Sequence, residues 1–83
     1  MRNLLAHKIR IVRKLNQWEA YGGAYKNVQR LKQGLPSHMR DMTLIDKAVK
    51  GLHQEGIVIL HKKNTCISLN PHEKEKIRKY LEG

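Results

Sequence analysis

The sequence predicts one small domain, residues 1–83, with an α+β fold that is mostly helical. Two observations lead to this fold class. Apolar residues recur at helical spacing in four stretches of the chain. Between residues 57 and 69 the pattern changes to a short β-branched run and then to alternation, which indicates two strands. With 83 residues, the chain is long enough for one hydrophobic core but not for two.

Residues 3–17 form the first predicted helix. At about 100° per residue, its apolar side chains fall on one broad face, which indicates packing against a core. These apolar residues are Leu4, Leu5, Ile9, Ile11, Val12 and Leu15. The opposite face carries His7, Arg10, Arg13 and Lys14. Lys8 falls inside the apolar arc, where we expect its aliphatic stem to cover the edge of the core.

A turn and a second helix follow. Gly22-Gly23 is a turn signal, because adjacent glycines adopt positive φ without steric cost. Beyond the turn, the spacing of Val28 and Leu31 predicts a helix over residues 25–33. Gly34, with a proline two residues later, ends this helix.

The third helix is predicted between residues 37 and 55, and its firm part starts near Asp41. Its inward face consists of Ile45, Ala48, Val49 and Leu52. The opposite face consists of Thr43, Lys47 and Lys50, and it is bordered by Asp46 and His53. Gly56 ends the helix.

A two-stranded β-hairpin is predicted next. Residues 57–60 are apolar and mostly β-branched, and residues 65–69 alternate. In the second strand, Cys66 and Ser68 are expected to point away from the core. Asn tolerates positive φ and suits a hairpin tip. The tip consists of Lys62, Lys63 and Asn64.

The last helix opens on several start signals that coincide. Asn70 is an N-cap, Pro71 occupies the first helical position, and Glu73 can reach back to the cap. The helix carries a narrow apolar stripe formed by Ile77, Tyr80 and Leu81.

The order of these elements predicts a winged helix-turn-helix: three helices, a two-stranded β-hairpin wing and a C-terminal helix. Residues 45–58 carry the strongest local signal. Leu52 fills the core from the end of the third helix, Gly56 reverses the chain, and Ile57-Val58 begins the wing against the same core.

Several motifs resemble those of a family of small archaeal winged-helix proteins. That family has a Y-G-G turn, a K-x-G-ϕ-P-x-H-ϕ-R junction and an S-L-N-P link to the last helix. The similar residues here are Tyr21-Gly22-Gly23, residues 27–40 and Ser68-Leu69-Asn70-Pro71. The resemblance covers about residues 21–81. It departs after Arg40, where the family often has R-G-E and this chain has Arg40-Asp41-Met42. The resemblance implies a winged-helix fold and, because these proteins are mostly described as DNA-binding, a DNA ligand.

The charge of the chain indicates a polyanionic partner. Lys and Arg number 17 against 7 acidic residues, which gives a net charge of +10 at pH 7. In a helix-turn-helix, the exposed face of the second helix of the motif enters the major groove of double-stranded DNA. The sequence therefore predicts DNA binding, as a small transcriptional regulator. The residues expected in the groove are Thr43, Asp46, Lys47 and Lys50.

Further contacts are expected outside the groove and carry no sequence information. Lys62, Lys63 and Asn64 at the wing tip are expected to reach phosphates or the minor groove. Arg30, Lys32 and Arg40 are expected to hold the flanking DNA backbone. The basic residues of the first and last helices are interpreted as solvated faces.

Two other functions stay open. Winged helices also serve as protein-docking modules, and an apolar stripe on the first or last helix can form the seam of a homodimer. An RNA-associated or ribosome-associated role draws on the same positive charge. Recognition of single strands uses exposed aromatic rings, however. None of Trp18, Tyr21 and Tyr25 falls on the expected contact helix.

No enzyme, cofactor, metal site or small-molecule substrate is expected. A nucleophile with its base and orienting group is hard to assemble from this composition, and no phosphate-binding loop occurs. His61 and Cys66 flank the hairpin tip, but two ligands fall short of the four that structural zinc takes. No apolar run approaches the ~18–20 residues of a membrane span. The single cysteine makes a reducing, cytoplasmic location the expectation.

Overall fold

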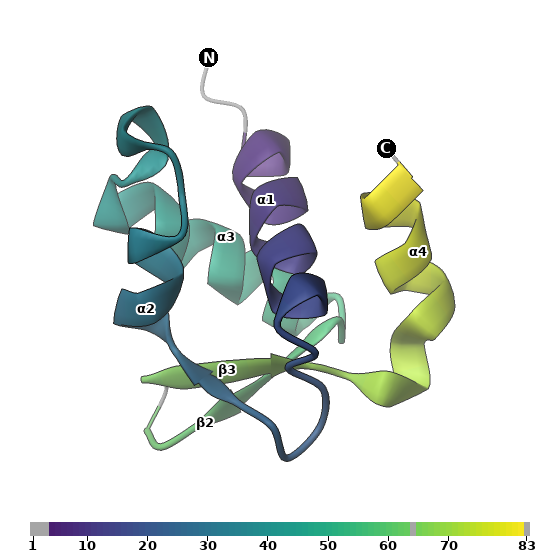
Figure 1. Ribbon diagram of the computed structural model, residues 1–83. Coiled ribbons are helices and arrows are strands. Elements are labelled where there is room, and N and C mark those ends of the chain that lie inside the picture. The colour runs from purple at the N-terminus through teal and green to yellow at the C-terminus, as the bar shows by residue number, and fades with distance from the viewer. Residues whose placement is uncertain (1–3, 64, 83) are drawn as a thin grey trace.

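The protein consists of helices and one small sheet, whose strands lie between the helices along the chain (Figure 1). The computed structural model describes residues 4–63 and 65–82, so Asn64 of the predicted wing tip lies outside the described residues. The order is α1 (Leu4–Gln17), β1 (Lys26–Asn27), α2 (Val28–Gln33), the 3₁₀ turn η1 (Ser37–Met39), α3 (Met42–Gln54), β2 (Val58–His61), β3 (Cys66–Leu69), the 3₁₀ turn η2 (Pro71–Glu73) and α4 (Lys74–Glu82). The prediction of a mostly helical α+β fold is confirmed.

The helices lie on one side of the sheet (Figure 1). Helix α1 stands in the middle and packs against α3 and α4, and α2 and α4 lie at opposite ends of the molecule. The fully buried apolar side chains of the core come from α1, α2, α3, β3 and two connecting segments: Ile11, Val12, Leu15, Ala20, Leu31, Ile45, Ala48, Leu52, Ile57, Ile67 and Leu69. No helix of the described chain has the length and apolar character to cross a membrane.

The sheet has three strands, whereas the sequence predicted a two-stranded wing. Its order is β1-β3-β2, and both pairings are antiparallel. Strand β1 consists of two residues that the sequence assigned to the second helix. Asn27 is extended, and its side chain accepts a hydrogen bond from the backbone N–H of Gln29 at 2.7 Å. It is therefore the N-cap of α2, which begins at Val28, three residues later than predicted.

Both faces of β3 are covered. Ile67 and Leu69 enter the core as predicted, but Cys66 and Ser68 are also buried, against the expectation for the outer face. The Ser68 hydroxyl donates to the carbonyl of Gly22 at 2.7 Å, so the loop before β1 folds over this side of the sheet. As the central strand, β3 has neighbours on both edges as well.

Helix α1 has the predicted bounds among the described residues, but its buried face is rotated. His7 was placed on the solvent face, yet it is 8% exposed. It lies one turn before the fully buried Ile11 and extends the same stripe. Leu5 was placed on the buried face and is 53% exposed. Neither ring nitrogen of His7 has a hydrogen-bond partner among the described residues.

Helix α3 begins where the sequence predicted. The side chain of Asp41 accepts the backbone N–H of Thr43 at 2.9 Å and caps the helix. The four residues assigned to the inward face are all buried. Gly56 follows the helix with φ of +80°, a conformation that favours glycine.

The last helix also begins at the predicted cap. The side chain of Asn70 accepts the backbone N–H of His72 at 2.9 Å, and the first turn is 3₁₀. Glu73 was expected to bond the N–H of Asn70, but that N–H donates to the carbonyl of Ile57 at 2.8 Å. Ile77 is buried, and the other two stripe residues pack against the core. The stripe therefore completes the core.

Candidate nucleic-acid interface

One face of α3 is exposed and polar. It carries all four residues that the sequence placed in the DNA groove, and we call it the α3 contact face: Thr43, Asp46, Lys47 and Lys50. Within the described residues, none of these four side chains makes a hydrogen bond or an ion pair. The helix is held by its opposite face, so this face is available to a ligand.

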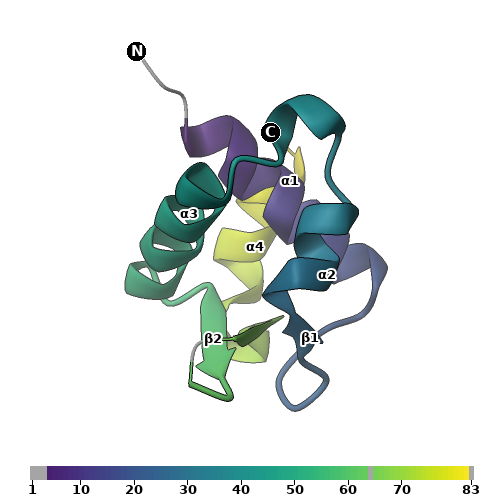
Figure 2. The ribbon, with the colours of Figure 1, turned by 90° about the vertical axis from the view of Figure 1, so that its left-hand side faces the viewer.

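The β-hairpin lies directly beside this face. A hollow of about 280 Å³ separates α3 from β2 and is lined by Asp46, Val49, Lys50 and Leu60. Figure 2 looks at the side of the molecule where α2, α3 and the hairpin are turned toward the viewer. The recognition helix and the wing of the sequence prediction are therefore neighbours in the structure.

A second hollow, of about 330 Å³, lies between the start of α2, the first turns of α3 and the start of β3. Asp46 borders both hollows and so stands where three elements meet. The residues that line the second hollow are Asn27, Val28, Gln29, Met42, Asp46 and Thr65. None of these lining residues is basic.

The hairpin tip holds two lysines in an unusual conformation. Lys62 and Lys63 have φ of 51° and 56°, in the left-handed region that costs a lysine about 1–2 kcal/mol. Thr65 fixes the turn, because its hydroxyl donates to the carbonyl of Lys62 at 2.7 Å. Nζ of Lys62 lies 5.7 Å from the centre of the Tyr25 ring, and that ring stacks on His61 with 4.7 Å between the ring centres. Lys63 is exposed, and its side chain has no partner in the described chain.

Two of the arginines predicted to touch the DNA backbone already have contacts inside the protein. The guanidinium of Arg30 lies over the Trp18 ring at 5.6 Å, at the junction of α1 and α2. Arg40 donates from Nε to the carbonyl of Leu35 at 2.9 Å and from Nη2 to that of Gln33 at 3.2 Å. Arg40 therefore satisfies the carbonyl of Gln33 at the end of α2, which the helix leaves without a partner, and that of Leu35 just beyond the helix. Lys32 is half-buried.

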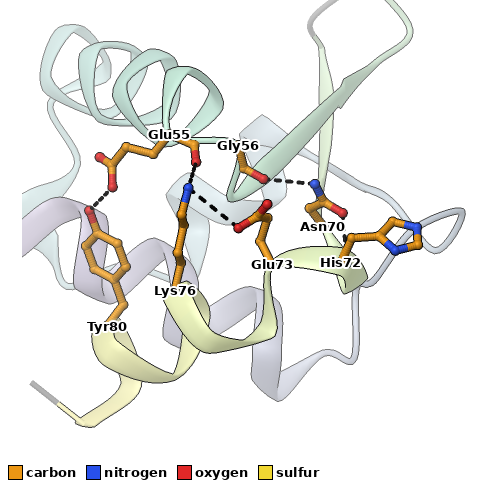
Figure 3. A network of polar contacts seen from close by, with 7 residues as sticks. All are labelled: Glu55, Gly56, Asn70, His72, Glu73, Lys76 and Tyr80. Carbon is orange, nitrogen blue, oxygen red and sulfur yellow. Dashed lines mark hydrogen bonds and ion pairs between the residues drawn. The ribbon is translucent and has the colours of Figure 1, made fainter.

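A polar network that the sequence did not reveal fixes the other end of α3. We call it the Glu55 network, and Figure 3 shows most of it. Glu55 accepts hydrogen bonds from Lys8 of α1 and from the Tyr80 hydroxyl of α4, both at 2.8 Å. Lys76 donates to the Glu55 carbonyl at 3.1 Å. The three helices are thereby tied together at the point where α3 leads into the hairpin.

The network shifts two pKa values in opposite directions. Burial raises the pKa of the Glu55 carboxyl, but the hydrogen bonds from Lys8 and Tyr80, with the charges of Lys8 and Lys76, outweigh it and leave that pKa below the usual 4.5. Burial, together with the hydrogen bond to Glu55 and its charge, raises the pKa of Tyr80 to about 12. At neutral pH the pair is a carboxylate and a neutral phenol.

The basic residues of α4 lie elsewhere. Figure 1 shows α4 on the side of the molecule away from the hairpin tip. Lys74 and Arg78 are exposed there. The structure therefore places this cluster away from the tip.

The two residues that flank the hairpin tip and could in principle ligate a metal are aligned in register, since His61 pairs with Cys66. Nε2 of His61 lies 3.0 Å from the Ser68 hydroxyl oxygen, so the ring is engaged within the sheet. In the described ranges no three His, Cys, Asp or Glu side chains gather to hold a metal ion.

Comparison with known proteins adds no neighbour. No protein-family model, no curated protein and no solved structure matches this chain. The resemblance to small archaeal winged-helix proteins therefore stays a prediction that rests on the sequence motifs.

Proposed function

We propose that this protein is a winged helix-turn-helix protein that binds double-stranded DNA and acts as a small transcriptional regulator. The observation that carries the proposal is the α3 contact face: four exposed polar side chains, without partners among the described residues, beside a hairpin whose tip carries two lysines. In this reading α3 enters the major groove, and the hairpin follows the adjacent backbone.

The arrangement of the elements supports the winged-helix reading. Helices α2 and α3 are consecutive and are joined by a turn that contains η1, and the hairpin directly follows α3. The additional strand β1 pairs with β3 on the side opposite β2. Its pairing ends at Asn27 opposite Cys66, so the hairpin tip projects beyond it.

The side chains of the face match the chemistry of the groove. Lysine donates to guanine O6 and N7, and threonine meets either base edges or phosphates. Lys47 and Lys50 therefore suit direct contact with base edges. Lys63 at the tip suits a phosphate, which positions the protein without reading sequence.

The test is fluorescence-anisotropy binding to a short duplex over a range of salt concentrations. The variants are Lys47→Ala and Lys63→Ala, with Lys74→Ala as the matched control, since Lys74 is an exposed lysine on the far helix. Lys63→Ala is expected to reduce the slope of log affinity against log salt by about 0.9, the value for one phosphate contact. Lys47→Ala is expected to weaken binding to a selected site more than binding to random duplex.

The control decides between a specific face and general charge. Lys74→Ala is expected to bind like the parent. If Lys74→Ala weakens binding as much as Lys47→Ala does, the charge acts without a defined face and the proposal is wrong.

A protein-docking module is the second candidate, and one observation favours it. A mostly apolar groove of about 290 Å³ lies between α1 and α4 and is lined by Leu5, Ile9, Lys79 and Tyr80. A residue-resolved NMR titration with duplex DNA separates the two functions. Shifts on α3 and the hairpin support DNA binding, and their absence directs the search to a protein partner at the groove.

A further inference from the structure

We propose that Asp46 reads the exocyclic amino group of a cytosine and thereby sets the base preference at one position of the bound DNA. This inference rests on the proposed function. It goes further because it names the base that is recognised, and because it distinguishes the residue that selects this base from the lysines that attract the DNA.

The first observation is that the Asp46 carboxylate has no internal partner. Lys50 follows it by four residues on α3, a spacing at which opposite charges commonly pair. No ion pair within 4.0 Å joins them, and Asp46 makes none with any other described residue. By contrast, Glu73 of η2 and Lys76 of α4 do pair, at 3.5 Å. The Asp46 carboxylate thus keeps its full capacity to accept hydrogen bonds.

The second observation is one of the two hollows that Asp46 borders, the one between α2, α3 and the start of β3. Lys50 lines the other hollow, but no lysine or arginine lines this one. The side-chain oxygen of Asn27 accepts the N–H of Gln29, and the Thr65 hydroxyl donates to the Lys62 carbonyl. The carboxylate is therefore the one charged group of the lining. A phosphate that entered this hollow would meet negative charge without a cation, whereas a hydrogen-bond donor would be accepted.

The chemistry of the major groove narrows the donor to one base. Guanine presents two acceptors and thymine presents an acceptor and a methyl group, so a carboxylate is repelled or left unsatisfied by both. Adenine presents its amino group beside the N7 acceptor, which again faces the carboxylate unfavourably. Cytosine presents the N4 amino donor with no acceptor of its own in the groove. Cytosine is therefore the base that Asp46 fits.

The placement of this carboxylate costs general affinity. An acidic group on a basic contact face weakens attraction to every phosphate nearby, whatever the sequence. A binding protein can gain selectivity in this way, by placing a group that repels the wrong partners even though it also lowers the overall affinity. Lys47 and Lys50, which follow Asp46 on the same face of α3, supply the attraction that Asp46 reduces.

The experiment is selection of duplexes from a randomised pool by the full chain and by three variants. Asp46→Ala removes the carboxylate, and Asp46→Asn replaces it with an amide, which pairs with adenine N6 and N7. Glu75→Gln is the matched control, because it removes one exposed acidic charge on α4. We expect the parent and the control to enrich cytosine at one position. At that position Asp46→Ala has no preference and Asp46→Asn moves it to adenine.

Binding to two duplexes that differ only at that position measures the size of the effect. The parent is expected to prefer the cytosine duplex about tenfold, within the range for one base contact, and Asp46→Ala is expected to bind both about equally. Retained enrichment of cytosine by Asp46→Ala overturns the inference, as does a parent that selects no cytosine. In both cases DNA binding by the parent leaves the proposed function intact. A parent that binds no duplex at any salt concentration instead overturns the proposed function itself.

Discussion

Replacing Lys63 with glycine is expected to stabilise the fold and to weaken DNA binding. With φ of 56°, Lys63 occupies a region that costs an L-residue about 1–2 kcal/mol and costs glycine nothing. Glycine also gives the unfolded chain more conformational freedom, which lowers the free energy of unfolding by about 0.4–1 kcal/mol. In the described part of the chain, the exposed ammonium group of Lys63 has no partner to lose. The free energy of unfolding is therefore expected to rise by about 0.5–1 kcal/mol.

The binding effect follows from the loss of one positive charge at the tip. One phosphate contact contributes about 0.9 to the slope of log affinity against log salt. Lys63→Ala is the matched variant, because it removes the same charge and keeps a side chain in the left-handed conformation. The two variants are expected to bind DNA equally and to differ in stability by the conformational contribution alone.

Urea unfolding followed by circular dichroism gives the stabilities, and anisotropy over a salt series gives the slopes. If Lys63→Gly and Lys63→Ala are equally stable, the left-handed conformation of the tip carries no cost and the reasoning fails. If both variants keep the slope of the parent, Lys63 does not contact the DNA backbone.

Four further outcomes are expected. His7→Leu is expected to raise the free energy of unfolding by about 1 kcal/mol, because two buried ring nitrogens without partners are removed; thermal unfolding checks this, and a loss of stability would contradict it. Gly51→Ala is expected to leave the stability of the parent nearly unchanged. Alanine gains about 0.5–1 kcal/mol of helix propensity, but its Cβ would lie 2.8 Å from Lys8 Cε and would displace Lys8 from its ion pair with Glu55, which offsets the gain. In a Lys8→Ala background the same substitution is expected to give the full gain, and equal effects in both backgrounds would show that the pair contributes nothing. Because folding lowers the pKa of Glu55, the contribution of its ionised carboxylate to the free energy of unfolding is complete above pH 4.5. This contribution is lost as the pH falls through the pKa of the folded state, so in an acid titration Glu55→Gln is expected to lose less stability than the parent. Because folding raises the pKa of Tyr80 from 10.0 to about 12, the contribution of its neutral phenol to the free energy of unfolding is complete below pH 10 and is lost as the pH rises to about 12. Tyr80→Phe is therefore expected to lose less stability in an alkaline titration than the parent does. Equal losses in the two proteins would show that another group causes the alkaline loss of stability.

The sequence predicts well what depends on neighbours along the chain. The bounds of α3, its cap at Asp41 and its division into a buried and an exposed face all follow from helical periodicity and local capping chemistry. The hairpin and the cap at Asn70 are equally local. Helical periodicity therefore predicts which residues form the exposed face of α3, and these residues are exposed in the structure.

What the sequence misses depends on partners far along the chain. Strand β1 has only two residues, and it is a strand only because β3 lies beside it. The Glu55 network joins residues from α1, α3 and α4, and no spacing rule connects them. His7 is buried because α1 is rotated relative to the arc that its apolar residues suggest, and the packing of α1 against its neighbouring helices and β3 decides that rotation.

The small strand β1 also has a consequence for the way this chain folds. Asn27 of β1 pairs with Cys66 of β3, which lies about 40 residues later in the chain. Their pairing therefore closes a long loop and must follow the local formation of the helices and the hairpin. During synthesis on the ribosome, the segment around β1 emerges well before the strand that will hold it. Until β3 has been made, the N-terminal half has no sheet to join, and the apolar side of α1 has only part of its final cover. Folding of this protein is thus expected to wait for its last third, as a single late event.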